Sequence, residues 1–225
     1  MSRILLTFLM ALISIICFSQ KHDYVSIETN LGTMIVQLSN ETPAHRDNFI
    51  RLVRNHYFNK TLFHRVIPRF VIQGGDPDSI LTTPADTNKL KAERIMPEFP
   101  ANLFHKRGAL GMGSDDNIFK ASFFTQFYIV VGRTYTDAEM DSVEKKRLQG
   151  RKISAERREA YKTIGGTPQL DGNYTIFGEV VRGLDVVDKI ANAPAVKTIP
   201  VDRVWMKLKL VKKKEARRLE INLHL

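Results

Sequence analysis

The chain has 225 residues, of which 43% are hydrophobic and 26% are charged. This length accommodates one full domain with a substantial core, and the balance of residue types excludes disordered, fibrous and multi-span membrane chains. The 34 basic and 24 acidic side chains give a formal net charge of +10. Cys17 is the only cysteine, which excludes an intramolecular disulfide and a cysteine-rich metal site.

Residues 1–19 differ in composition from the rest of the chain. Arg3 is their only charged side chain, and residues 4–18 form a nearly unbroken apolar run. A basic start, a short apolar run and small residues at its end are typical of a secretory signal peptide. We therefore predict that residues 1–19 are removed by a cut ahead of Gln20.

Two other interpretations of this apolar run are less favoured. A membrane span needs about 20 apolar residues, whereas this run is shorter and the chain turns polar at Lys21. Lipid attachment at Cys17 usually follows a small residue, and the chain has the bulkier Ile16 there. We therefore predict an exported protein, periplasmic or secreted, with no membrane span after signal removal.

The first elements of the domain, which we place at residues 22–211, read as a hairpin and a helix. Residues 24–27 and 34–38 are rich in β-branched side chains, as in strands, and Asn-Leu-Gly lies between them. A helix is expected from Pro43 to about residue 55, because proline suits the first helical position. Thr42 is expected to cap this helix by accepting from an exposed backbone N–H.

Residues 61–73 have the pattern of one strand that ends at two adjacent glycines. Strand alternation would place six of its side chains on one face: Phe63, Arg65, Ile67, Arg69, Val71 and Gln73. An arginine and a glutamine among apolar side chains are costly to bury without partners. This face is therefore either an ordinary strand with a structural arginine or a functional site.

The remaining barrel elements follow after a surface loop expected at residues 78–94. Four further segments are predicted as strands, at residues 110–114, 123–131, 174–181 and 204–210. A short helix is expected over residues 184–190. Many strands with few, separated helices favour a mainly β fold, an antiparallel sheet closed into a barrel.

Residues 133–162 interrupt the β pattern with nine basic and six acidic side chains. Thr136 and Glu139 have the spacing of a capping box. Helices are expected over about residues 137–148 and 154–162, forming a helical insertion at about 134–165. Because its charge density leaves little apolar surface to bury, we expect the insertion to be peripheral and dispensable for chemistry.

The C-terminal residues 212–225 form a basic tail. Residues 207–220 contain seven basic and two acidic side chains. Such clusters can bind nucleic acid or anionic lipid, but no aromatic residue follows Trp205 to stack on bases. We favour a solvated, charge-rich tail and expect no nucleic-acid partner.

Common catalytic motifs are absent from the sequence: it has no phosphate-binding loop, no GxSxG and no HExxH. The histidines are dispersed without the spacing of metal ligands: His45, His56, His64 and His105. Each is more simply a surface or core histidine. We therefore expect no metal and no cofactor.

The stretch at residues 63–77 resembles the signature of the cyclophilin family of peptidyl-prolyl cis-trans isomerases. Residues 107–112, 125–129 and 170–178 resemble three further segments of that family, in the family's order. Four collinear matches that together span about residues 24–211 are far more specific than one.

The resemblance implies an eight-stranded antiparallel barrel closed by two helices, and isomerisation of bonds that precede proline in unfolded or flexible polypeptides. Arg65 matches the catalytic arginine. The other matching residues fall into three groups: Phe70, Val71, Tyr128 and Leu170 in an apolar proline pocket with Tyr174 at its edge, Gln73 and Gln126 as polar groups that hold the substrate backbone, and Gly113 and Ser114 in the segment that pairs with it.

The chain also departs from the family pattern. Gln169 stands where the family often has Trp or His, so the family's cyclosporin contact is not carried over to this chain. An alternative function is a non-catalytic module that binds proline-containing segments, as a chaperone would. The presence of Arg65 favours the enzyme, because gripping proline alone would not require an arginine.

Overall fold

The computed structural model describes residues 22–76, 93–115 and 117–223. The predicted signal peptide, its cleavage site and most of the predicted loop at 78–94 lie outside these residues. No helix among the described residues is long and apolar enough to cross a membrane.

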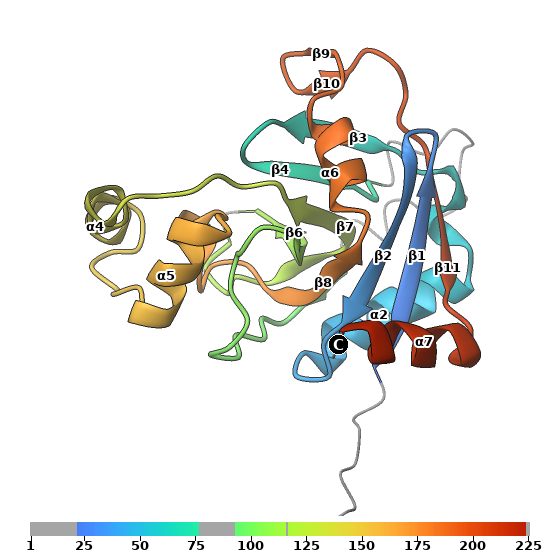
Figure 1. Ribbon diagram of the computed structural model, residues 1–225, viewed down its shortest axis with the longest axis horizontal. Coiled ribbons are helices and arrows are strands. Elements are labelled where there is room, and N and C mark those ends of the chain that lie inside the picture. Colours follow the sequence, from blue (N-terminus) through green and yellow to red (C-terminus); the bar gives the residue numbers. More distant parts are fainter. Residues whose placement is uncertain (1–21, 77–92, 116, 224–225) are drawn as a thin grey trace, which may run out of the picture.

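The described residues contain a nine-stranded antiparallel sheet that curls into a barrel (Figure 1). Eight strands follow one another along it in the order β11-β1-β2-β8-β6-β7-β4-β3, and β5 pairs with β7. Their bounds are β1 Tyr24–Thr29, β2 Gly32–Leu38, β3 Phe63–Ile67, β4 Val71–Gly74, β5 Arg94–Ile95, β6 Ala109–Ser114, β7 Ser122–Val130, β8 Ile176–Arg182 and β11 Met206–Leu210. A small separate hairpin joins β9 (Ala195–Val196) to β10 (Ile199–Pro200). The predicted eight-stranded antiparallel barrel is confirmed, with β5 as a short addition.

The barrel closes where the start of β3 meets the start of β11. Leu62 and Trp205 form an antiparallel bridge. The Phe63 N–H donates to the carbonyl of Val204 over 2.9 Å, and the Met206 N–H donates to that of Thr61 over 3.3 Å. This seam is shorter than the pairing of β1 with β11 or with β2, because only the strand ends meet.

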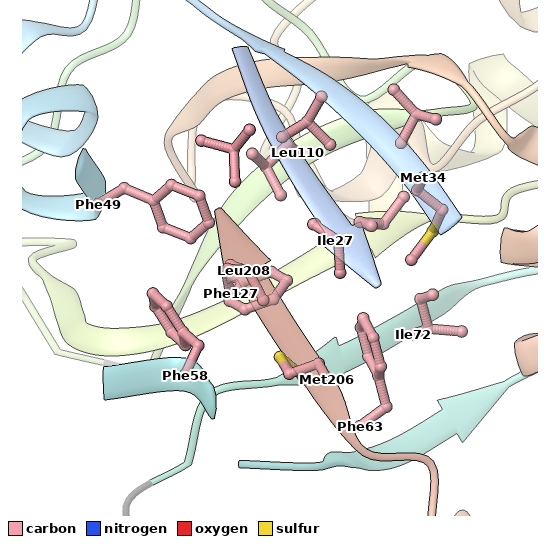
Figure 2. Packing of buried hydrophobic residues seen from close by; sticks show 14 of the residues in the cluster. Ile27, Met34, Phe49, Phe58, Phe63, Ile72, Leu110, Phe127, Met206 and Leu208 are labelled. Carbon is pink, nitrogen blue, oxygen red and sulfur yellow. The ribbon is translucent and has the colours of Figure 1, made fainter. Parts of the chain in front are cut away.

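Two helices cover the barrel, α2 (Pro43–Arg54) and α6 (Leu184–Ala191). The apolar face of α2 is buried through Phe49, Leu52 and Val53, and that of α6 through Val187 and Ile190. These side chains join the strands' inner faces in one core, to which the 3-10 helix η1 (Tyr57–Lys60) adds Phe58. Figure 2 shows the rings of Phe49, Phe58 and Phe127 grouped in this core, with centroids 5.2–5.5 Å apart. Both predicted helices are confirmed.

The predicted cap of α2 is wrong. The Thr42 hydroxyl accepts no capping hydrogen bond and has no partner among the described residues. Instead, the two carboxylate oxygens of Glu98 accept from the N–H groups of Ala44 and His45, each over 3.1 Å. A carboxylate is better suited to this place, because its negative charge also faces the positive end of the helix dipole.

The alternation predicted one strand over residues 61–73, and this prediction is wrong, because the segment forms two strands. β3 ends at Ile67, and β4 begins at Val71 after a tight turn. Arg69 takes a left-handed backbone conformation in that turn, with φ of 63°. The hairpin places Arg65 directly opposite Gln73 on the neighbouring strand.

The insertion contains α4 (Asp137–Lys146) and α5 (Ala155–Thr163), and the capping box of Thr136 and Glu139 is present as predicted. Both helices lie to one side of the barrel (Figure 1). The expectation of little buried apolar surface is wrong. Five buried side chains form a small core of their own: Tyr135, Met140, Leu148, Ile153 and Tyr161.

The C-terminal residues also differ from the predicted solvated tail. They form α7 (Lys213–Leu223), which lies beside the start of β1 (Figure 1). Leu219 is buried against Tyr24 and Ile35. The basic side chains remain on the exposed face, so the tail is an amphipathic helix held by an apolar contact.

Candidate active site

Three polar side chains form a continuous row across the β3–β4–β7 face. The guanidinium Nη1 of Arg65 donates to Oε1 of Gln73 over 3.0 Å. The amide nitrogen of Gln73 in turn donates to Oε1 of Gln126 over 2.8 Å. All three side chains are half-buried. An arginine presents five donors in a rigid fork, of which this contact uses one.

The predicted apolar pocket residues come together beside this row. Val71 and Tyr128 are buried in one cluster with Ala109, Val130 and Ile176, and four half-buried side chains pack against it: Phe70, Leu103, Leu170 and Tyr174. The strand register places the polar row next to the apolar cluster, because Gln73 on β4 lies opposite Tyr128 on β7. A surface depression of about 550 Å³ borders the cluster, and Phe70, Leu170 and Tyr174 line it.

Tyr128 forms the floor of this cluster and is only 4% exposed. Its ring lies directly over Gly111, where a Cβ atom would overlap the ring. Its hydroxyl is 2.8 Å from Nε2 of His105, beneath the pocket. Burial raises the pKa of the Tyr128 hydroxyl well above its ordinary value, so this group stays neutral.

Gly113 and Ser114 lie at the end of β6, beside the polar row. A Cβ atom on Gly113 would lie 3.2 Å from the carbonyl oxygen of Gln126, so a glycine lets these two strands approach closely. The Ser114 hydroxyl donates to the carbonyl of Ala121 over 2.7 Å and accepts from the Asn117 amide over 3.1 Å. Its side chain therefore holds the loop between β6 and β7 in place.

A buried hydrogen-bonded pair of His105 and Asp171 under the pocket was not predicted from the sequence. Oδ1 of Asp171 is 2.8 Å from Nδ1 of His105 and also accepts from the His105 N–H over 3.0 Å. Burial alone would raise the pKa of Asp171, but the hydrogen bonds from His105 and Tyr161 lower it below its ordinary value. His105 was expected to be a surface or core histidine, and it is a core one. The only sequence signal was the place of Asp171 directly after Leu170.

Among the described residues, no group of three or more His, Cys, Asp and Glu side chains could hold a metal ion. The site consists of fixed donors beside an apolar pocket.

Comparison with known proteins shows the family of this chain. The model of the cyclophilin type peptidyl-prolyl cis-trans isomerase family matches residues 24–212. The chain belongs to this family. It is a cyclophilin-type peptidyl-prolyl cis-trans isomerase, as the four sequence segments predicted.

Relatives agree with the family assignment. A peptidyl-prolyl cis-trans isomerase of Acinetobacter baylyi is 33% identical over 172 residues, which cover 76% of this chain and 72% of the relative. A peptidyl-prolyl cis-trans isomerase-like 2 of Rhizopus delemar is 33% identical over 181 residues, covering 78% of this chain and 26% of that longer protein.

Solved structures show the same fold. A cyclophilin type isomerase of Cryptosporidium parvum has a TM-score of 0.61 at 24% sequence identity, covering 85% of this chain and 99% of that one. The same cyclophilin, crystallised in the presence of the dipeptide Ala-Pro, has a TM-score of 0.60 and covers 84% of this chain.

Proposed function

We propose that this cyclophilin isomerises X–Pro bonds at the face formed by Arg65 and the Tyr128 cluster, and that Arg65 is its catalytic residue. The observation that carries the proposal is the hydrogen-bonded row Arg65–Gln73–Gln126 beside an apolar cluster. A proline-containing segment needs both features, because its ring is apolar and its flanking amides are polar.

The reaction requires rotation about one bond. Resonance in the peptide bond opposes rotation by about 18–20 kcal/mol, and X–Pro isomers interconvert only over about tens to hundreds of seconds. In the twisted state the prolyl nitrogen loses this resonance and regains a lone pair. A donor placed at that nitrogen interacts with the twisted state far more than with the planar one, which is how it lowers the barrier.

Arg65 is suited to supply this donor. Its charge is permanent, and the bond to Gln73 fixes the guanidinium without using its remaining N–H groups. The proposed pocket of Phe70, Val71, Tyr128 and Leu170, with Tyr174 at its edge, would hold the proline ring and exclude water. Gln126 would bind the substrate backbone, and Gly113 and Ser114 would lie along it.

The substrates we propose are proline-containing stretches of unfolded or flexible polypeptides, and the role is to assist folding. The crystallisation of the Cryptosporidium parvum cyclophilin with Ala-Pro supports a proline dipeptide as the central recognition element. We further propose that the protein acts outside the cytoplasm, periplasmic or secreted, which the apolar run at residues 4–18 supports.

The experiment is a protease-coupled isomerisation assay on an X–Pro tetrapeptide, with Arg65→Ala and the control Arg54→Ala. Arg54 is exposed in the last turn of α2. We expect Arg65→Ala to lower kcat/KM by about 10²–10³, by analogy with the loss of one oxyanion-hole donor, and Arg54→Ala to leave it unchanged. A protein that binds the peptide but does not accelerate its isomerisation would instead be a binding module.

A further inference from the structure

The helical insertion is joined to the floor of the proline pocket by a buried series of hydrogen bonds. The Tyr161 hydroxyl, on α5 of the insertion, donates to Oδ2 of Asp171 over 2.8 Å. Asp171 bonds His105 through its other oxygen, and His105 bonds Tyr128, each over 2.8 Å. None of these four residues is more than 5% exposed.

The donor and the acceptor of each hydrogen bond in the series follow from the ionised carboxylate of Asp171. The low pKa of Asp171 keeps its carboxylate ionised, so it can only accept, from the Tyr161 hydroxyl and from Nδ1–H of His105. In a neutral imidazole, Nδ1–H leaves Nε2 without a proton, and Nε2 then accepts from the Tyr128 hydroxyl. Every polar atom of the series is satisfied in this arrangement.

Close packing holds Tyr161 against the segment that contains His105. The Tyr161 ring lies edge-on to Phe104, with centroids 5.5 Å apart. At Gly166, an added Cβ atom would overlap the His105 carbonyl and lie 2.6 Å from the Tyr161 ring. The Tyr161 carbonyl also accepts from the N–H of Tyr135 over 3.1 Å. These contacts tie Tyr161 to the segment that contains His105, so we expect a change in α5 to reach His105.

The insertion also reaches the rim of the pocket. Arg147, directly after α4, lines the same surface depression as Phe70 and Leu170. The Tyr135 hydroxyl donates to Oε1 of Gln169, next to Leu170, over 3.3 Å. The insertion thus meets the pocket at its floor and at its edge.

We propose that the insertion sets the geometry of the proline pocket, with Tyr161, Asp171 and His105 acting as positioning residues for Tyr128. This inference rests on the proposed function of the pocket and names a determinant of it. A buried hydroxyl without a partner is costly. If the His105 ring rotated, the Tyr128 hydroxyl would lose its hydrogen bond. The Tyr128 ring, which supports the proline, would then shift so that the hydroxyl could bond to another group.

The test is a double-mutant cycle in the full chain with Tyr161→Phe, Tyr128→Phe and the combined variant. Each substitution removes one hydroxyl and keeps the ring. Tyr24→Phe is the control, because Tyr24 is a buried tyrosine in the separate cluster at α7. Activity on an X–Pro peptide is measured as kcat and KM, and thermal unfolding confirms that each variant is folded.

We expect Tyr161→Phe to lower kcat/KM roughly two- to tenfold, the range of one neutral hydrogen bond, mainly through a higher KM. In the Tyr128→Phe background the series has already lost its last hydroxyl. Tyr161→Phe should there change the logarithm of kcat/KM by less than half as much as it does in the wild-type background. Tyr24→Phe should leave both kinetic parameters unchanged. An equal fold-change in both backgrounds, or an equal loss in Tyr24→Phe, would overturn the proposal.

A second readout does not depend on catalysis. The Nδ1–H proton of His105 is buried and hydrogen-bonded, so it should give a slowly exchanging NMR signal. Tyr161→Phe should shift this signal and the ring signals of Tyr128. If the protein lacked isomerase activity, the proposed function would fail, while these shifts would still establish the coupling. Unchanged His105 and Tyr128 signals in Tyr161→Phe would refute the coupling whatever the activity.

Discussion

Arg65 and Gln73 face each other across the β3–β4 hairpin, and the guanidinium donates to the amide oxygen over 3.0 Å. Because the Gln73 amide nitrogen is itself bound to Gln126, the amide cannot turn without breaking a second bond. The arginine is therefore positioned by two strands and not only by its own backbone.

The first prediction concerns this contact. Gln73→Ala should release the guanidinium and lower kcat/KM on an X–Pro peptide by about tenfold, a smaller loss than that of Arg65→Ala, because the charge remains present. Steady-state kinetics of both variants would test the order. Equal activity of Gln73→Ala and wild type would show that Arg65 is fixed by other means.

The second prediction concerns Gly111. A Cβ atom there would overlap the Tyr128 ring, so Gly111→Ala must push the ring away or strain both strands. We expect the free energy of unfolding to fall by about 1–3 kcal/mol, as in other overpacked cores, and KM for the peptide to rise. Urea unfolding and kinetics would measure the two effects. An unaltered KM would mean that the ring position does not govern substrate binding.

The third prediction is a pH dependence of stability. His45 is fully buried, with Nδ1 2.7 Å from Glu98 and Nε2 3.0 Å from Ser122. Burial lowers the pKa of His45 below its ordinary value of 6.5, and the attraction of Glu98 only partly opposes this. The pKa of His64 is lowered in the same direction, also by burial.

The direction in which the free energy of unfolding changes with pH follows from proton uptake. Below pH 6.5 the unfolded chain binds protons at these histidines that the native state does not take up. The free energy of unfolding is therefore fully retained above this pH and falls as the pH drops towards the native-state pKa values. Urea unfolding at about pH 7.5 and about pH 5.5 should show the loss. NMR titration of His45 with a pKa at or above 6.5 would contradict the prediction.

The fourth prediction concerns export. The mature protein recovered from the producing cell should begin at Gln20, because the preceding apolar run has the form of a cleaved signal. Mass spectrometry of the intact protein decides the matter. A retained Met1 would exclude cleavage, and a lipid on Cys17 would indicate a membrane-anchored form.

The barrel was predictable because its strands carry strong local signals. The alternation in β11 is an example, since Met206 and Leu208 are buried while Lys207 and Lys209 are exposed. The hairpin turn after Ile67 was not predictable from alternation. It depends on Arg69 adopting a positive φ, which few sequence patterns indicate for an arginine.

The site was predicted in part for a similar reason. The family segments contain Arg65, Gln73 and Gln126, and the structure brings these together. The partners of Tyr128 lie far away in sequence, with His105 23 residues before it. Spacing alone could not connect them, because His105 lies outside the strands, in a segment that comes next to Tyr128 only in the folded chain.

The structure gives the insertion a different expected role from the one that its sequence indicated. Its charge content predicted a peripheral segment, but charge counts do not show which few side chains point inward. Tyr161 is one of these, and it is fully buried. Replacing residues 136–164 by a short link would remove it, so we now expect that deletion to impair the pocket.

The seam between Leu62 and Trp205 also constrains how the chain reaches its native state. β11 pairs with β1 along its whole length, with Val25 opposite Leu210, and meets β3 at the seam. The first strand of the domain therefore lacks one neighbour until nearly the last residues of the domain have been synthesised. Such pairing between chain ends slows folding, and it leaves strand edges open to aggregation in the meantime. The barrel therefore cannot close before β11 is available to pair with β1 and to meet β3. Trp205, the only tryptophan, lies at this closing contact.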